Sequence, residues 1–224
     1  MIKIENTEVV GWEHAIRGMR NPMNSWAQSD SGDCAYLNEV FCGSCPQHDI
    51  ERCSGVYVGK NDQALMMKLR NAGTDHRKFM RMITVYADVT APLYWFKEYD
   101  TYKVGTVANS CSTMHKIHAK EFTLDDFSHE HLTSGALDVL NATIDHLNFC
   151  RKWFLSENKK TWWWQMIQLL PSSYNQKRTV MLNYEVLANI YKSRKNHKLD
   201  EWHDFCKWIE SLPYSELITG EDEE

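Results

Sequence analysis

The chain has 224 residues, of which 43% are hydrophobic and 12% aromatic, so it can bury a substantial core and is not a disordered protein. Its formal charge of −5 disfavours broad binding to nucleic-acid phosphates. No apolar run reaches the roughly 20 residues of a membrane-spanning helix, and the first residues lack a secretory signal pattern, which favours the cytoplasm. The odd number of cysteines, 7, favours reduced thiols over a disulfide framework.

The first half of the chain alternates between strand and helix signals. Alternation of apolar and polar residues marks the strands, and the helix at 61–73 is bounded by a capping residue, Asn61 or Asp62, and by Gly73. In chain order, the predicted elements are a strand at 2–10, a helix at 11–21, a loop or insertion at about 22–55, a helix at 61–73, a strand at 83–89 and a helix from Pro92.

The second half of the chain is predicted to be helical. Apolar residues at steps of three and four between Leu137 and Phe154 predict a helix packed on other helices. Trp162 to Trp164 would face three directions on a helix, so a core or subunit interface is favoured over ligand stacking. The predicted helices lie at 131–155, 160–171, 181–195 and 199–213. These elements predict an α+β fold, with one helix-dominated domain over residues 1–224 and a small antiparallel or mixed sheet.

Four cysteines lie in the predicted insertion at 22–55. Cys34, Cys42, Cys45 and Cys53 follow the pattern C-x7-C-x2-C-x7-C, and four thiolates can bind zinc tetrahedrally. Common zinc modules carry two CxxC knuckles, whereas this pattern has one. We therefore favour a loop with reduced thiols and keep a zinc-dependent interaction module as the weaker alternative.

Two polar stretches are candidates for ligand binding. The basic residues between His76 and Arg81 follow a helix end, where they form either a clamp for phosphate or carboxylate or a solvated loop. Residues 101–116, TYKVGTVANSCSTMHK, lack hydrophobic periodicity and carry small hydroxyl and amide side chains. We favour a ligand-contacting turn over a polar surface loop there, and we interpret Cys111 as a small buried thiol and not as a nucleophile.

In this order of elements, the chain resembles the flavin-dependent thymidylate synthases. One matching segment runs from Ala91 and Pro92 into residues 101–116, where Asn109 and Ser112 fall on the asparagine and serine of the family signature. The second begins at Leu170 and Pro171, and its matching residues are Asn183, Asn189, Arg194, His197 and Glu201.

The same comparison shows where this chain departs from the family pattern. The family's Arg-His-Arg reads Thr101, Tyr102 and Lys103, and its signature glutamate is Ser110. Its Arg-Tyr pair reads Met114 and His115, and a further arginine position holds Ile167. Because arginine forks suit a nucleotide phosphate, the flavin side of the site resembles the family better than the uridylate side does. Lys103, His115, Lys116, Lys177 or Arg178 are candidates to restore an anion site.

The resemblance implies site residues and an activity. FAD would be held by Asn109, Asn183, Asn189, Arg194, His197 and Lys103, and the nucleotide would be contacted by Ser112, Ser110, His115 and Glu98. The activity would be one-carbon transfer from methylenetetrahydrofolate to C5 of a deoxypyrimidine monophosphate such as dUMP, with NADPH as reductant and a homotetramer as the assembly. This class needs no protein nucleophile. The alternative is a non-catalytic nucleotide- or flavin-binding protein on the same scaffold.

Overall fold

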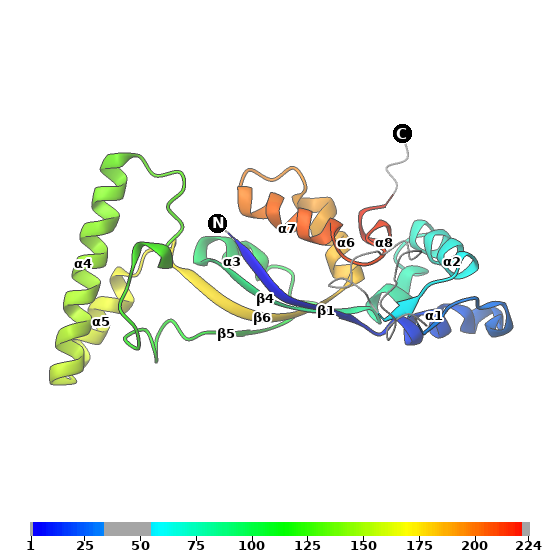
Figure 1. The fold of residues 1–224 in the computed structure, drawn as a ribbon, viewed down its shortest axis with the longest axis horizontal. Coiled ribbons are helices and arrows are strands. Elements are labelled where there is room, and N and C mark those ends of the chain that lie inside the picture. Colours follow the sequence, from blue (N-terminus) through cyan, green and yellow to red (C-terminus); the bar gives the residue numbers. More distant parts are fainter. Residues whose placement is uncertain (1, 34–54, 221–224) are drawn as a thin grey trace, which may run out of the picture. The chain divides into compact units, whose positions relative to one another are not determined.

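The structure, a computed structural model, describes residues 2–33 and 55–220. Its strands are β1 (Lys3–Val10), β2 (Gly32–Asp33), β3 (Val56–Tyr57), β4 (Thr84–Pro92), β5 (Val107–Ser110) and β6 (Asn175–Asn183). Its α-helices are α1 (Trp12–Arg20), α2 (Lys60–Asn71), α3 (Leu93–Tyr99), α4 (Ser134–Glu157), α5 (Lys160–Leu169), α6 (Tyr184–Arg194), α7 (Asp200–Glu210) and α8 (Glu216–Thr219). Short 3₁₀ helices are η1 (Asn21–Met23), η2 (Trp26–Gln28), η4 (Arg77–Arg81) and η5 (Leu124–Asp126). The predicted helix-dominated α+β class is confirmed (Figure 1).

The larger sheet has the strand order β1-β4-β6-β5, and β2 pairs with β3 in an antiparallel ribbon. Two of its strands were not predicted. The helix expected at 181–195 begins only at Tyr184, because the residues before it belong to β6. Strand β6 was missed because a buried polar side chain, Gln176, interrupts its apolar alternation. Within the predicted turn, residues 107–110 form β5, an edge strand whose side chains are all exposed and which therefore carries no burial pattern.

The chain divides into two compact units. The first unit comprises Met1–Lys3, Val89–Thr101 and Asn109–Thr179, and the second comprises Ile4–Asp88, Tyr102–Ala108 and Val180–Glu224. Because the chain passes between the units several times, they are not successive segments joined by one linker. The single domain over residues 1–224 stays a prediction.

In the second unit, α6 packs against α7, α8 and η4. Figure 1 shows α7 and α8 beside α6. Helix α7 buries Trp202, Phe205 and Ile209, whose steps of three and four residues place them on one helical face. This core holds α6 in place, and α6 carries two of the predicted flavin residues, Asn189 and Arg194.

A buried ion pair ties α1 to α2 in the second unit. The Asp62 side chain is fully buried and accepts a hydrogen bond from Arg20 Nε at 2.6 Å. It also accepts from the hydroxyls of Ser29 and Ser31 at 2.7 and 2.6 Å. Burial by itself raises the pKa of this carboxyl, but the two hydroxyls and Arg20 outweigh it, so the pKa of Asp62 lies below its ordinary value.

The predicted cap of α2 was wrong. The N-cap position is Gly59, and the Asp30 carboxylate accepts from the backbone N–H groups of Asn61 and Asp62 at 2.9 and 3.1 Å. A carboxylate from a distant segment therefore caps this helix, because the helix begins at Lys60 and both predicted capping residues lie inside its first turn. The predicted C-terminal glycine is confirmed, since Gly73 follows the helix with φ of 102°.

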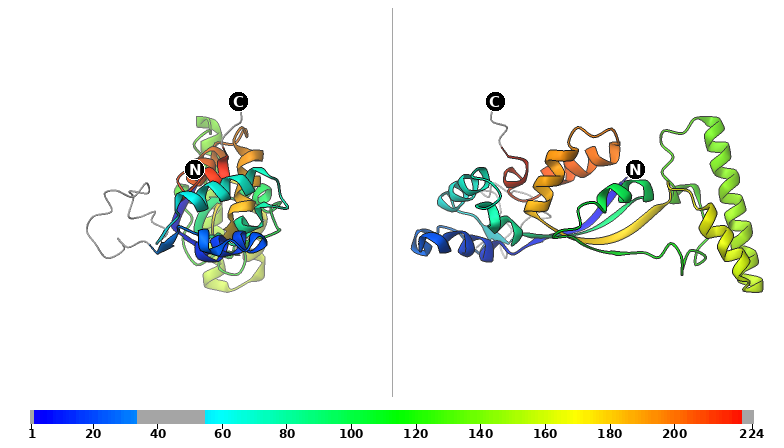
Figure 2. Two further views of the ribbon diagram at one scale, coloured as in Figure 1. Left: turned by 90° about the vertical axis from the view of Figure 1, so that its right-hand side faces the viewer. Right: turned by 180° about the vertical axis from the view of Figure 1, so that it is seen from behind.

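In the first unit, α4 and α5 form a helical hairpin, and Figure 2 shows the two helices side by side. The predicted apolar seam of α4 is confirmed, since Leu140, Ile144 and Leu147 are buried and pack in one cluster with Met166 of α5. Of the three successive tryptophans of α5, Trp162 and Trp163 pack against this cluster, whereas Trp164 is 42% exposed. Aromatic side chains therefore remain on the surface of this hairpin.

Some predictions concern residues outside the described ranges. Cys34, Cys42, Cys45 and Cys53 all lie in residues 34–54, so the zinc hypothesis is not addressed by the structure. Over residues 2–33 and 55–220, no group of histidine, cysteine and acidic side chains has a metal-binding arrangement. Within the same ranges, no helix has both the length and the apolar content needed to cross a bilayer.

Candidate functional site

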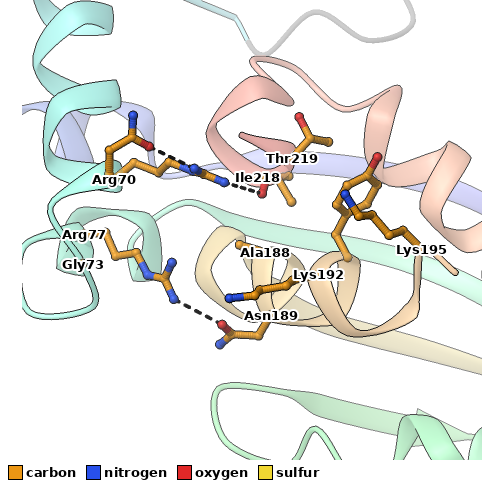
Figure 3. A pocket seen from close by; sticks show the side chains of 11 residues that line it. Arg70, Gly73, Arg77, Ala188, Asn189, Lys192, Lys195, Ile218 and Thr219 are labelled. Carbon is orange, nitrogen blue, oxygen red and sulfur yellow. Dashed lines mark hydrogen bonds between the residues drawn. The ribbon is translucent and has the colours of Figure 1, made fainter. Parts of the chain in front are cut away.

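A basic pocket of about 450 Å³ lies in the second unit (Figure 3). Four cationic side chains line it: Arg70, Arg77, Lys192 and Lys195. Asn189 also lines the pocket, and no lining residue is acidic. The residues come from the end of α2, from η4, from α6 and its C-terminal end, and from α8. A wall with this balance of charge is suited to an anionic ligand.

The cation that contacts Asn189 is held from behind by a buried carboxylate. Arg77 donates from Nε to Glu185 at 3.4 Å and from a terminal nitrogen to Asn189 Oδ1 at 3.2 Å. Arg81 also donates to the Glu185 carboxylate. Burial by itself raises the pKa of Glu185, but its hydrogen bonds and charge interactions with Arg81 and Arg77 outweigh burial and hold the pKa below its ordinary value. Glu185 is therefore a carboxylate that organises two arginines.

The opposite side of the pocket depends on a glycine. Arg70 donates to the carbonyl oxygens of Leu217 and Ile218, which ties α2 to α8. Gly220 follows α8 with φ of 77°, and a β-carbon there would lie 2.1 Å from an Arg70 terminal nitrogen. The Arg70 guanidinium is the mobile end of a long side chain and could shift, so the positive φ is what favours glycine at this position.

Asn183, the first predicted flavin residue, sits where β6 passes into α6. Its side chain caps α6 by accepting from the backbone N–H of Val186 at 3.0 Å. Gly105 of the stretch TYKVGTVANSCSTMHK lies against it with φ of 77°, and a β-carbon on Gly105 would lie 2.9 Å from Asn183 Nδ2. The start of the predicted ligand-contacting stretch and the start of α6 are thus in direct contact.

Arg194 and His197 lie at the C-terminal end of α6 and beyond it. The Arg194 guanidinium stacks on Trp202, 4.7 Å from the ring centroid, and donates to the Tyr102 hydroxyl at 2.8 Å. His197 accepts from the backbone N–H of Leu199 through Nδ1 at 3.2 Å. Tyr102, which stands at the histidine position of the family's Arg-His-Arg, is therefore a hydrogen-bond partner of Arg194. The neighbouring Lys103 is exposed.

The residues predicted to contact the nucleotide lie in the first unit. Ser110 is in β5 with Asn109, and both are exposed. The Ser112 hydroxyl accepts from the backbone N–H groups of Met114 and His115 at 3.2 and 2.8 Å, which forms a local turn. Glu98 lies in α3, apart from that turn in the chain.

Four of the five candidates for the missing anion site also lie in the first unit: His115, Lys116, Lys177 and Arg178. Arg178 pairs with Asp100 at 2.7 Å and lies over the Phe96 ring at 3.8 Å, so its charge is already balanced within the fold. Cys111 is exposed, which corrects its interpretation as a buried thiol. Its backbone is fixed to β6, since its N–H donates to the Lys177 carbonyl at 2.9 Å.

The structure thus gathers Asn183, Asn189, Arg194, His197 and Lys103 in the second unit. It places Asn109, Ser110, Ser112, His115 and Glu98 in the first. Sequence reasoning identified Arg77 and Arg81 as a basic group but missed Arg70, Lys192, Lys195 and Glu185. The helical spacing of Asn189 and Lys192 was a usable signal, because residues three apart share a helix face. Nothing in the sequence indicated that Arg70 and Ile218 would line the same pocket.

No protein-family model and no curated protein matches the sequence. Among solved structures, the chain is similar to thymidylate synthase X (ThyX) from Helicobacter pylori with FAD and dUMP, at 15% identity over 98% of each chain and a TM-score of 0.66. It is also similar to the UMP/dUMP methylase PolB from Streptomyces cacaoi bound with 5-Br UMP, at 11% identity over 98% of this chain and 94% of that chain, with a TM-score of 0.56. The resemblance predicted from the sequence is confirmed at the level of architecture, and the chain has the fold of the flavin-dependent thymidylate synthases.

Proposed function

We propose that the chain is a flavin-dependent enzyme that transfers a one-carbon unit to C5 of a deoxypyrimidine monophosphate such as dUMP. The observation that carries the proposal is the likeness in fold, over 98% of both chains, to a ThyX enzyme solved with FAD and dUMP. The basic pocket beside Asn189 supports it, because both ligands of that enzyme bear phosphate.

The donor set of the basic pocket fits FAD. Its lining offers four cations and no carboxylate, and an FAD diphosphate is anionic. Bound FAD would supply hydride and one-carbon chemistry, with methylenetetrahydrofolate as the carbon source and NADPH as the reductant. The chain's own residues would bind and orient the cofactor: Asn109, Asn183, Asn189, Arg194, His197 and Lys103.

For the nucleotide, we propose contacts from the first unit. Ser112, Ser110, His115 and Glu98 are the candidates, with the Ser112 turn directing the backbone of His115. Arg178 is a poor candidate for the nucleotide phosphate, since Asp100 already neutralises it. Lysine and histidine near this turn would bind the phosphate with less directional hydrogen bonds than the arginines of the family signature provide.

We further propose a homotetramer that works in the cytoplasm. Phe149, Trp153 and Trp164 of the α4–α5 hairpin are 40–49% exposed, and a subunit interface would bury these rings. Cys111, Cys150 and Cys206 are free thiols, which suits a reducing compartment. Light scattering coupled to size-exclusion chromatography would give the assembly state directly.

The decisive experiment is to purify the protein, record its flavin absorbance and assay it with FAD, NADPH, methylenetetrahydrofolate and dUMP. We expect FAD to be released on denaturation and mass spectrometry to detect methylated nucleotide. Arg194→Ala should weaken FAD retention, whereas Lys198→Ala, which removes an exposed cation nearby in sequence, should not. A protein that takes up FAD but forms no product would contradict catalysis.

The alternative is a non-catalytic protein that binds a nucleotide or flavin. The replacement of signature arginines by Thr101, Lys103 and Met114 favours it, as does the neutralisation of Arg178. This alternative predicts tight binding of dUMP or FAD by calorimetry without turnover. A colourless protein that binds neither ligand would exclude both functions.

A further inference from the structure

A second pocket, separate from the basic one, lies beside α1 in the second unit. Its volume of about 390 Å³ falls in the usual range for small-molecule sites, and it shares no lining residue with the basic pocket. We propose that this α1 pocket binds a small zwitterion with an aromatic ring, of the class of the aromatic α-amino acids. The proposal goes beyond the proposed function, because it needs neither flavin nor nucleotide.

A buried arginine offers one unused nitrogen at this pocket. Arg20 is 3% exposed and lines the pocket. Its Nε donates to Asp62 at 2.6 Å, and Nη1 donates to the carbonyl and the hydroxyl of Ser25 at 3.2 and 3.3 Å. Among residues 2–33 and 55–220, no acceptor meets its other terminal nitrogen, Nη2. Because buried polar groups are normally hydrogen-bonded, Nη2 is a donor suited to a ligand carboxylate.

Two oppositely charged side chains of α1 line the same pocket. Glu13 and Arg17 are four residues apart, which places them on one face of the helix, and both are exposed. They form no ion pair with each other, and neither side chain has a hydrogen-bond partner in the described part of the chain. Asp33 of β2 adds a second exposed carboxylate to the lining. The ammonium and carboxylate of an α-amino acid are also close neighbours, so an acid and an arginine at this spacing can bind both groups.

The apolar part of the lining is suited to an aromatic ring. Trp26 of η2 is 50% exposed, and its Nε1 donates to Asn21 Oδ1 at 2.8 Å, which orients the indole. No aromatic or cationic side chain of the described ranges contacts the Trp26 ring, so the ring is available for stacking. Ile16 and Val56 supply aliphatic contacts in the same pocket. A planar ligand ring would therefore gain both stacking and apolar burial here.

The balance of charge in the lining favours a zwitterion over a simple anion. Asp62 already neutralises Arg20, which leaves Arg17 as the cation to be balanced by a ligand. Glu13 and Asp33 would repel an aromatic carboxylate that approached Arg17. An ammonium group on the same ligand converts this repulsion into attraction. The basic pocket, whose lining has no acidic residue, has no such preference.

The test is calorimetric titration of the purified full-length protein with L-phenylalanine and three analogues. 3-Phenylpropanoate lacks the ammonium group, phenethylamine lacks the carboxylate, and L-alanine lacks the ring. We expect one molecule of L-phenylalanine to bind per chain. Each analogue should bind at least about tenfold more weakly, because each loses either a charged hydrogen bond or the stacking contact.

Substitutions of exposed residues assign the two charged groups of the ligand. Glu13→Gln should weaken binding of L-phenylalanine about tenfold and leave binding of 3-phenylpropanoate equal or tighter, because only the ammonium loses its partner. Arg17→Gln should weaken binding of both ligands. The control is Glu8→Gln, which removes the same charge from an exposed position of β1 outside the pocket and should change each affinity less than about twofold.

Three results would overturn the proposal. The first is no binding to wild-type protein at about 10 mM L-phenylalanine, and the second is 3-phenylpropanoate binding as tightly as L-phenylalanine. The third is a Glu13→Gln variant whose affinity for L-phenylalanine stays within about twofold of wild type. Trp26→Ala should abolish the preference for L-phenylalanine over L-alanine, and an unchanged preference would overturn the assigned stacking. None of these measurements involves FAD uptake or turnover, so failure of the proposed function would leave this proposal in place.

Discussion

The buried carboxylate of Asp62 should be a main determinant of stability in the second unit, and Asp62→Asn tests this. Asp62 Oδ1 accepts from Arg20, while Oδ2 accepts from two hydroxyls and from the backbone N–H groups of Asp30 and Ser31. An asparagine has only one side-chain oxygen, which can accept either from Arg20 or from the groups at the Oδ2 position. In both cases its NH₂ group faces hydrogen-bond donors at the other position. The substitution also leaves the buried Arg20 without its counter-charge.

The expected cost follows from the class of interaction. Removing one partner of a buried ion pair typically lowers the free energy of unfolding by about 3–5 kcal/mol. For a chain of this length, about 2–4 °C of melting temperature is lost per kcal/mol, so the variant should melt roughly 6–20 °C below wild type. Urea denaturation at pH 7 measures the free energy, and Asp138→Asn on the exposed surface of α4 is the control, expected within about 0.5 kcal/mol of wild type.

The stabilisation of the fold by Asp62 should depend on pH in a defined direction. Because the pKa of Asp62 is lowered in the folded chain, its ionised form stabilises the fold above the pKa of the unfolded state, and this contribution is lost as pH falls through the folded value. The difference between wild type and Asp62→Asn should therefore shrink in acid. A destabilisation below 1 kcal/mol at pH 7, or a difference that grows as pH falls, would refute the reasoning.

Two further predictions concern backbone geometry and thiol reactivity. Gly105→Ala places a β-carbon 2.9 Å from Asn183 Nδ2 at a positive φ, so it should lower the free energy of unfolding by about 1–2 kcal/mol in the same urea assay. The control is Gly135→Ala in α4, which should be neutral or stabilising because its β-carbon would meet nothing within 4 Å. Burial and, to a lesser extent, Glu210 raise the pKa of Cys206 to about 11. After iodoacetamide treatment at pH 8, peptide mapping should therefore find the exposed Cys111 alkylated well before Cys206. Equal rates of alkylation would contradict the assigned burial of Cys206.

The parts of the fold that the sequence predicted are those with strong apolar periodicity. The α4 seam and the buried face of α7 both have side chains whose spacing directly reflects burial. Strand β5 could not be found in this way, because an edge strand with exposed side chains has no periodic burial. The capping of α2 by Asp30 depends on a contact between residues more than thirty positions apart, and local capping preferences carry no information about it.

Among the residues of the candidate site, those with a recognisable local sequence signal were predicted and the others were missed. Asn183 and Asn189 were identified because their positions match a family pattern, and Arg77 because it lies in a conspicuous basic group. Glu185 was missed, since an acidic residue in the first turn of a helix usually needs no explanation beyond the helix dipole. Its role follows only from tertiary contacts with Arg77 and Arg81, which lie over a hundred positions away.

The distribution of cations bears on how this chain would recognise phosphate. Signature positions that hold arginine in the family hold Thr101, Lys103 and Met114 here, and Arg178 is neutralised by Asp100. The cations that line the basic pocket are two arginines and two lysines, and they come from α6, from the ends of α2 and α6, and from η4. A lysine offers a point charge without the planar fork of arginine, so directional recognition must come from other groups. Arg77 is one cation of this pocket whose planar fork is held in a fixed direction, because Glu185 accepts from its Nε edge and Asn189 Oδ1 accepts from a terminal nitrogen. Removing the Glu185 carboxylate would therefore loosen an arginine that lines the pocket.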